Sequence, residues 1–262
     1  MDIEEKALKK LEQRLYRYIK EYKFREKDID ERETEEEVFD ENTLKTLYEL
    51  SNEGVINELY GVVSAGKESR VYAGLDCEGN PIAIKIFLIQ TAEFRKGRMK
   101  YIIGDPRFES VGRSMHKIVY LWTQKEFRNL KVAYEAGVYV PKPIAFKNNV
   151  LVMEFIGEDF TPAPLIKDYK RVTNYMLYQI LRQIYLLYNE AELIHTDLSE
   201  YNIFYYKRKP VIFDFGQAVS TKHPMAETFL IRDISNVLNF FRNRGVEVDI
   251  TVDEVLEYIK GG

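Results

Sequence analysis

The sequence has very little cysteine and no long hydrophobic run. Its 262 residues include a single cysteine, Cys77, which excludes an internal disulfide framework and fits a reducing compartment. No apolar stretch approaches the roughly 20 residues that a membrane-spanning helix needs, and residues 1–6 are too charged for a signal peptide. We therefore expect a soluble, cytoplasmic protein with no membrane partner. The net charge of −4 gives no reason to expect nucleic-acid binding over the whole surface.

The hydrophobic content of 45% is enough for a large core, and the periodicity of the apolar residues changes along the chain. A period of three to four predicts helices, and a period of two predicts strands. The strands predicted before residue 88 form an antiparallel meander, and together with the helices before and after it they predict an α+β fold. An acidic linker is expected at 28–41. The predicted helices cover 1–26, 43–50, 122–136, 171–191, 226–244 and 252–260, and the predicted strands cover 62–63, 71–73, 82–87 and 150–156.

The stretch 193–202 carries the spacing His-x-Asp-x-x-x-x-Asn in His195, Asp197 and Asn202, and an apolar run ends in Asp214 twelve residues later. One aspartate that accepts a hydroxyl proton, with an asparagine and a second aspartate on a metal, forms the machinery of kinase-type phosphoryl transfer. We therefore predict Asp197 as the catalytic base, and Asn202 and Asp214 as oxygen ligands of Mg²⁺. For His195, bracing of the backbone is favoured over proton transfer.

Lys85 interrupts the apolar strand at 82–87, and a buried ammonium group needs an anionic partner. The phosphates of ATP together with a helix carboxylate would supply one, as in the strand lysine and helix glutamate of kinases. We predict Glu126, on the helix at 122–136, as this carboxylate. Glu135 is the rival, but it lies at the exposed end of that helix. A lysine that only extends from a strand edge into solvent is the weaker alternative.

The turn between the first two predicted strands is a candidate ATP-binding loop. A glycine-rich loop works because its backbone N–H groups approach phosphate oxygens, but here Gly66 is the only glycine and the G-x-G-x-x-G motif is absent. Ser64, Lys67 and Ser69 could supply donors instead. Glu68 belongs to the same predicted ATP-binding set.

A candidate adenine hinge lies at the end of the strand predicted at 150–156. Its backbone N–H and C=O groups, at Met153, Glu154 and Ile156, would pair with the base. An ordinary buried strand explains the same pattern equally well, so the sequence leaves both interpretations open.

Residues 88–118 form a long basic insertion with seven Lys or Arg residues against three acids. Long loops inside compact domains are usually functional or disordered. Its bases could contact nucleic-acid phosphates, Ser110 or Ser114 could accept a phosphate, or the segment could simply close over the nucleotide as a solvated loop. The sequence does not separate these alternatives.

Taken in order, these motifs resemble the RIO family of atypical serine/threonine protein kinases, most closely its RIO1 branch in the archaeal form. The resemblance covers the chain from about residue 43 onward. It rests on SAGKE at 64–68 (the family usually has Thr second), WTQKEFRNL at 122–130, MEFIG at 153–157, HTDLSEYN at 195–202 and DFGQA at 214–218.

This resemblance implies a bilobal, trimmed protein-kinase-like fold with an ATP site and Mg²⁺ or Mn²⁺. It implies serine autophosphorylation, ATPase activity in which Asp214 is transiently phosphorylated, and pre-30S small ribosomal subunit particles as the partner in subunit maturation. On this basis residues 1–50 would be an N-terminal helical extension, residues 51–156 the N-lobe, and residues 157–262 a short C-lobe.

The end of the chain limits the substrates. Only 46 residues follow Gly216, and they contain no Ala-Pro-Glu triplet, so the usual activation segment and peptide-docking platform are not expected. Thr196 stands where ordinary kinases carry the arginine that contacts activation-loop phosphate. The alternatives are a small-molecule phosphotransferase of the aminoglycoside type, or a non-catalytic nucleotide-binding assembly factor. The DFGQA and SAGKE motifs disfavour the first, and the complete set of polar site residues disfavours the second.

Overall fold

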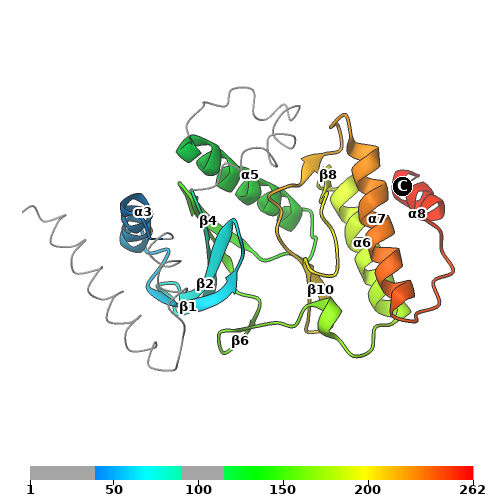
Figure 1. The fold of residues 1–262 in the computed structure, drawn as a ribbon, viewed down its shortest axis with the longest axis horizontal. Coiled ribbons are helices and arrows are strands. Elements are labelled where there is room, and N and C mark those ends of the chain that lie inside the picture. Colours follow the sequence, from blue (N-terminus) through cyan, green and yellow to red (C-terminus); the bar gives the residue numbers. More distant parts are fainter. Residues whose placement is uncertain (1–38, 90–114, 262) are drawn as a thin grey trace, which may run out of the picture.

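The structure is a computed structural model that describes residues 39–89 and 115–261 (Figure 1). The helix predicted at 1–26, most of the acidic linker and basic insertion, and both candidate serines, Ser110 and Ser114, lie outside these residues. No helix within the described ranges is long and apolar enough to cross a membrane.

The first lobe is built on one antiparallel sheet of five strands in the order β1-β2-β3-β5-β4. The turn between the second and third strands is held by Asp76, whose carboxylate accepts from the N–H groups of Glu78 at 2.9 Å and Asn80 at 2.8 Å. A fourth strand of five residues was not predicted, because it is too short to show a clear period. The strands are β1 (Glu58–Ala65), β2 (Ser69–Leu75), β3 (Pro81–Phe87), β4 (Pro143–Lys147) and β5 (Val150–Glu154).

The helix predicted at 43–50 is α3 (Glu41–Asn52), which begins after Asp40, an N-cap whose side chain accepts from the N–H of Thr43 at 2.7 Å. Leu47 and Leu50 are buried against the sheet residues Ile82, Ile84, Ile86, Val150 and Val152. The helix therefore closes one face of the sheet and shares the N-lobe core, rather than standing apart as an appendage.

The opposite face of the sheet is covered by α5 (Met115–Glu135), as Figure 1 shows. Because successive strand residues point to opposite faces, Lys85, Phe87 and Leu151 face this helix while their neighbours face α3. The helix begins seven residues earlier than predicted, so residues 115–118 are its first turn and not part of an irregular insertion. Gly137 follows its end with a φ of +77°, as expected of a glycine that stops a helix.

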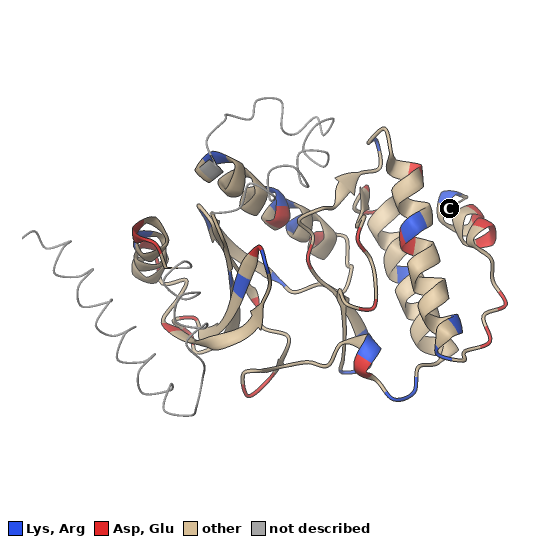
Figure 2. Ribbon diagram, viewed as in Figure 1, with Lys and Arg blue, Asp and Glu red and all other residues tan. Residues whose placement is uncertain are grey.

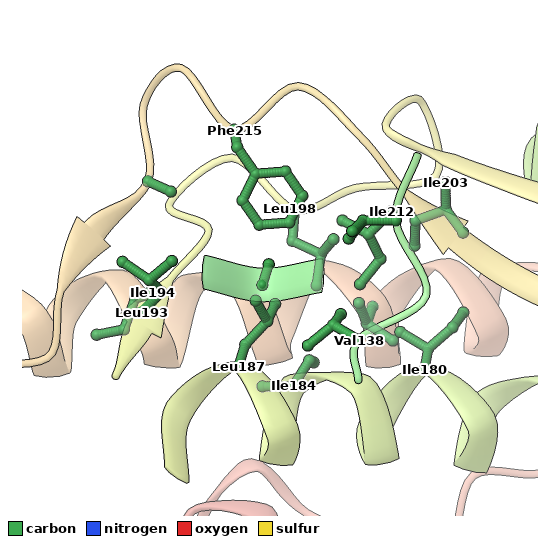
Figure 3. Close-up of a cluster of buried hydrophobic side chains, with 14 of the residues drawn as sticks. Val138, Ile180, Ile184, Leu187, Leu193, Ile194, Leu198, Ile203, Ile212 and Phe215 are labelled. Carbon is green, nitrogen blue, oxygen red and sulfur yellow. The ribbon is translucent and has the colours of Figure 1, made fainter. Parts of the chain in front are cut away.

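The second lobe contains three helices and several short strand pairs. In Figure 3, the side chains of Ile180, Ile184 and Leu187 rise from α6 toward the layer that holds Ile194 and Leu198 of the stretch 193–202, together with Ile212. The core of this lobe therefore lies directly beneath the predicted site. Thr251 and Glu254 form a capping box at the start of the last helix. The helices are α6 (Asn174–Asn189), α7 (Ala226–Asn243), α8 (Val252–Lys260) and the 3-10 turn η1 (Ile166–Asp168); the strands are β6 (Gly157–Glu158), β7 (Thr161–Pro162), β8 (Leu193–Ile194), β9 (Ile203–Tyr206), β10 (Lys209–Ile212) and β11 (Val219–Ser220).

The hairpin of β9 and β10 sets the distance between two predicted metal ligands. Its two-residue turn, Lys207 and Arg208, has φ values of 49° and 64°, a geometry that usually selects Asn-Gly. Asn202 directly precedes β9, and Phe213 directly follows β10. The N–H of Phe213 donates to the carbonyl of Asn202 at 3.1 Å, so the two ends of the hairpin are joined.

Candidate active site

Lys85 lies at the centre of the site. Its Nζ is 2.7 Å from Oε1 of Glu126 and 3.0 Å from Oδ1 of Asp214, which joins β3, α5 and the loop after β10. Burial by itself lowers the pKa of Lys85, but the charges of Asp214 and Glu126 outweigh it and hold that pKa above its ordinary value. The ammonium therefore stays charged, and a fixed positive charge is what a phosphate-binding lysine must provide.

Glu126, and not Glu135, is the carboxylate of α5 that contacts Lys85. Glu126 is only 2% exposed and faces the sheet. Glu135 lies on the solvent side, where it pairs with Lys131 across 3.8 Å. The two carboxylates are nine positions apart on a helix of 3.6 residues per turn, so they point to different sides of α5.

The backbone on both sides of Asp197 is fixed by Asp233, a buried residue on α7. The carboxylate of Asp233 accepts from the N–H of Thr196 at 2.7 Å and from the N–H of Leu198 at 3.1 Å, so it grips the backbone on both sides of the predicted base. Burial raises the pKa of Asp233 to about 7, against the two backbone hydrogen bonds, which lower it. Asn236, one turn further along α7, donates to the carbonyl of Leu198 at 3.1 Å.

Thr196 has a φ of 68°, which is an outlier for a β-branched residue. Such strain persists only where the surroundings over-determine the backbone. Besides the bond to Asp233, Arg232 donates to the carbonyl of Thr196, and the Thr196 hydroxyl donates to the carbonyl of Gln217 at 3.1 Å. Gln217 in turn donates through Nε2 to Oδ2 of Asp197 at 3.2 Å, so the DFGQA loop (residues 214–218) contacts the predicted base directly.

His195 braces the backbone, as predicted. Its Nε2 lies 2.9 Å from the carbonyl oxygen of Phe213, and since a carbonyl only accepts, this nitrogen carries the proton. Burial lowers the pKa of His195, so the ring is neutral. Its position under the loop, edge-on to the ring of Phe215 at 4.9 Å between centroids, gives it no direct role in proton transfer.

The predicted metal ligands fit an oxygen-binding cation. The Nδ2 group of Asn202 donates to the carbonyl of Asp197 at 2.8 Å, which fixes the amide plane and turns Oδ1, the predicted ligand atom, to the other side. The side chain of Asp214 is 47% exposed, and its φ of 66° is a left-handed conformation. No group of three or more His, Cys, Asp or Glu that could hold a metal occurs in residues 39–89 and 115–261. A cation here would therefore use one Asp, one Asn and phosphate or water oxygens, as Mg²⁺ commonly does.

Comparison with known proteins settles the family. A family model described as the RIO domain matches residues 70–255, which is most of the chain. The chain belongs to the RIO family. It is 38% identical over 261 residues to the RIO-type serine/threonine-protein kinase Rio1 of Haloferax volcanii, covering all of this chain and 89% of that protein. It is 40% identical over 236 residues to the same kinase of Methanocaldococcus jannaschii, covering 90% and 80%.

Solved RIO structures share the fold. The Rio2 kinase of Chaetomium thermophilum superposes with a TM-score of 0.63 at 24% identity, over 81% of this chain and 66% of that one. The ADP/Mg²⁺-phosphoaspartate complex of the same kinase gives a TM-score of 0.61 at 23% identity, over 81% and 64%. The α+β, protein-kinase-like fold expected from the sequence is thus confirmed.

The predicted ATP-binding loop of this RIO chain is a tight turn. The N–H of Gly66 donates to the carbonyl of Ser69 at 3.0 Å, and Arg70 donates to the carbonyl of Gly66. Ser64 and Lys67 are exposed and carry donors, while the carbonyl of Glu68 accepts from Leu88 at 2.9 Å. The turn is close to Lys85, because Ser69 pairs with Phe87 and Val71 with Lys85 in the sheet.

The hinge predicted for the RIO nucleotide site overlaps the end of β5: Met153 and Glu154 are the last two residues of the strand, and Ile156 lies just beyond it. Part of its backbone is already used: the N–H of Glu154 donates to Lys142 at 2.8 Å, and the carbonyl of Ile156 accepts from Ala163 at 2.9 Å. Adenine recognition would therefore have to use other backbone groups of this segment. Met153 is partly buried and packs beneath Ala73, Ala83 and Phe155.

Sequence reasoning did not assign roles to Asp233, Gln217, Lys125 or Asn129 in this RIO chain. For Asp233 the signal was present, because an acid stands among Leu230, Ile234 and Val237 on the apolar face of α7. The same reasoning identified Lys85 within an apolar strand. Lys125 and Asn129 donate to backbone carbonyls, and Gln217 donates to the carboxylate of Asp197, twenty positions away in the chain. A sequence pattern does not show which distant acceptors are near.

Proposed function

We propose that this protein is an ATP- and Mg²⁺-dependent serine/threonine protein kinase that phosphorylates itself and also hydrolyses ATP. The observation that carries the proposal is the contact of the buried Lys85 ammonium with both Glu126 and Asp214. A charged lysine fixed between two acids orients phosphates, and a base held at a nearby loop orients the hydroxyl. Mn²⁺ would serve the same oxygen ligands as Mg²⁺.

In the kinase reaction, Asp197 accepts the proton of a serine hydroxyl as its oxygen attacks the γ-phosphorus of ATP. The bond to the β–γ bridging oxygen breaks, and ADP leaves with that electron pair. In the ATPase reaction, a carboxylate oxygen of Asp214 attacks the γ-phosphorus instead, and water then cleaves the acyl phosphate to give phosphate and regenerate the acid. The half-exposed side chain of Asp214 and the phosphoaspartate named for the Rio2 complex support this second route.

The proposed setting is the cytoplasm, on precursors of the small ribosomal subunit. Its support is the RIO1 relatives with which the chain shares 38–40% identity over most of its length. Contact with rRNA through the basic insertion, and Ser114 or Ser110 as the autophosphorylated residue, are part of this proposal. Co-sedimentation of the protein with 30S precursors, in the presence and absence of ATP, tests it. Equal sedimentation with mature subunits and precursors would contradict it.

A small-molecule phosphotransferase and a non-catalytic assembly factor are the other two candidates. Membership in the RIO family disfavours the first. The complete Lys85, Glu126 and Asp214 arrangement disfavours the second, since a chain without catalysis has no use for an aspartate in a left-handed backbone conformation that is paired with a buried lysine.

One experiment separates these functions. The protein is incubated with γ-labelled ATP and Mg²⁺, and wild type is compared with Asp197→Ala and Asp214→Ala for phosphate release and for protein labelling. Both activities should fall in both variants. Undiminished hydrolysis in both would refute the site assignment, and wild type that neither hydrolyses nor becomes labelled would favour the assembly factor. A serine label that survives Ser114→Ala would eliminate Ser114 as the main acceptor.

A further inference from the structure

A second buried lysine, besides Lys85 on β3, lies on α5 immediately before Glu126. Lys125 is fully buried, and its Nζ donates to the carbonyl of Gly216 at 2.9 Å and to that of Ala218. One turn later, Nδ2 of Asn129 donates to the carbonyls of Phe215 at 2.9 Å and Ala218 at 3.0 Å. Two side chains of one helix thus hold three carbonyls of the DFGQA loop.

Trp122 completes the same face of α5. Positions 122, 125 and 129 follow the helical spacing i, i+3, i+7 and therefore line one side of the helix. A Cβ atom added to Gly216 would lie 2.8 Å from the indole Nε1 of Trp122 and 3.0 Å from two ring carbons, so glycine alone fits against this ring. The Lys125 ammonium also lies 5.3 Å from the centre of the indole ring. We call Trp122, Lys125 and Asn129 the α5 clamp.

We propose that the α5 clamp is a positioning site that fixes the DFGQA loop to the helix, so that Asp214 and Glu126 reach Lys85 as one rigid unit. The role assigned to Asp214 rests on the proposed function. On α5, Lys125 of the clamp directly precedes Glu126, the partner of Lys85. Figure 2 shows a basic and an acidic segment next to each other in the middle of this helix.

The backbone of Asp214 needs such support. Its φ of 66° is unfavourable for a residue with a side chain, and strain of this kind relaxes unless neighbouring contacts prevent it. The clamp holds Gly216 and Ala218 on either side of Gln217, together with Phe215, and Gln217 is the residue that donates to Asp197. The clamp therefore acts on the predicted metal ligand and on the predicted base through the same short loop.

The clamp also makes the helix and the loop interdependent. In ordinary protein kinases the position of the corresponding helix and of the metal-binding loop is adjusted by phosphorylation of an activation segment. Here the helix that carries Glu126 cannot move away from the sheet without taking the DFGQA loop with it, because their contacts are buried hydrogen bonds. The site is thus assembled without a separate activating step.

The test measures Mg²⁺-dependent ADP binding by calorimetry, because this readout does not require turnover. Lys125→Met keeps the length of the side chain and removes its donors, and Asn129→Leu does the same for the amide. Each should weaken the apparent Mg²⁺ affinity of the ADP complex by about 10- to 100-fold, the usual effect of losing a group that orients a metal ligand. ADP binding without Mg²⁺ should not change. Lys131→Met, on the exposed side of the same helix, is the matched control and should match wild type.

The variant Asp214→Asn separates a failure of the clamp proposal from a failure of the metal-ligand assignment of Asp214. If Asp214→Asn loses the Mg²⁺ dependence while Lys125→Met and Asn129→Leu keep it, the clamp is refuted and the proposed function stands. If Asp214→Asn itself keeps the Mg²⁺ dependence, the metal assignment is wrong and the clamp falls with it.

A second pair of variants covers the case in which Lys125→Met does not fold. Gly216→Ala should displace the loop by steric contact with the indole and should lower the Mg²⁺ affinity without removing any donor. Adding Trp122→Phe makes room for the new methyl group and should restore part of that affinity. A double variant no better than Gly216→Ala would overturn the proposal.

Discussion

Replacing Asp233 by asparagine would measure what the buried carboxylate contributes to the catalytic loop. The side chain keeps its shape, but an asparagine offers one acceptor oxygen where the carboxylate offers two. The N–H groups of Thr196 and Leu198, now 2.7 Å and 3.1 Å from the two oxygens, would therefore share a single acceptor. One of them would face an NH₂ group, and the backbone around Asp197 would lose its fixed position.

The expected magnitude follows from that lost bond. A hydrogen bond to a charged group contributes about 1.5–3 kcal/mol. If about 2 kcal/mol of it serves to position Asp197, kcat should fall by about 30-fold, since each 1.36 kcal/mol is a factor of ten in rate. The loss should appear in kcat rather than in KM for ATP, because Asp233 contacts the loop of the base and not the Lys85 cluster.

The pH dependence of stability and of activity gives a second, independent test of this prediction. The pKa of Asp233 is about 7 in the folded protein, against 3.8 ordinarily. Between these two values the folded state keeps a proton that the unfolded state has lost, so the carboxyl group's contribution to stability falls as pH rises, by about 1.36 kcal/mol per pH unit. Above about pH 7 this contribution no longer changes with pH, because the group is then ionised in both states. Activity should change in the opposite direction, because only the ionised form accepts both N–H groups.

The assay is phosphate release from ATP on both sides of pH 7, alongside urea unfolding at the same pH values, for wild type and Asp233→Asn. Wild-type kcat should rise through about pH 7, and the variant should lack that rise. Asp233→Glu, which keeps two oxygens, is the matched control and should retain part of the rise. A variant with wild-type kcat and a wild-type pH profile would refute the role of Asp233.

Three further predictions concern the Lys85 cluster, Gln217 and the core. Lys85→Met should lower the free energy of unfolding by about 3–5 kcal/mol in urea, because Glu126 would remain as a buried charge without its ammonium, and Glu126→Gln in the same background should recover part of the loss. Gln217→Ala should lower kcat by about fivefold with no change in melting temperature, since it removes one hydrogen bond to Asp197; an unchanged kcat would contradict the contact. Ile184→Ala should cost about 2–5 kcal/mol of stability by calorimetry, and a smaller loss would mean that the core beneath the loop collapses into the cavity.

The parts of the site that were predicted from sequence are those in which one residue type contrasts with its surroundings. Lys85 is a charge in an apolar strand, and Asp214 ends an apolar run. The match of the RIO domain to residues 70–255 agrees with the family inferred from those motifs. A site that depends on a charged side chain within an apolar segment can be recognised from the sequence alone.

The parts that were missed depend on contacts between distant backbone segments. β8 and β11 have two residues each, too few to show a period, yet their pairing brings the catalytic stretch beside the DFGQA loop. The position of α3 against the sheet was also left open, because an amphipathic helix shows which face is apolar but not what covers it. The start of α5 was placed seven residues late, since residues 115–121 add only about two turns to the pattern.

The β9–β10 hairpin has an evolutionary consequence. Asn202 and Asp214 are twelve positions apart because two paired strands and a two-residue turn separate them, with Ile203 opposite Ile212. Inserting or deleting one residue in a strand would shift the register and turn every following side chain to the other face. Substitutions can therefore accumulate along this hairpin, including the basic pair at its tip, while its length cannot drift. Among diverging sequences, this fixed interval should outlast the identity of most residues within it.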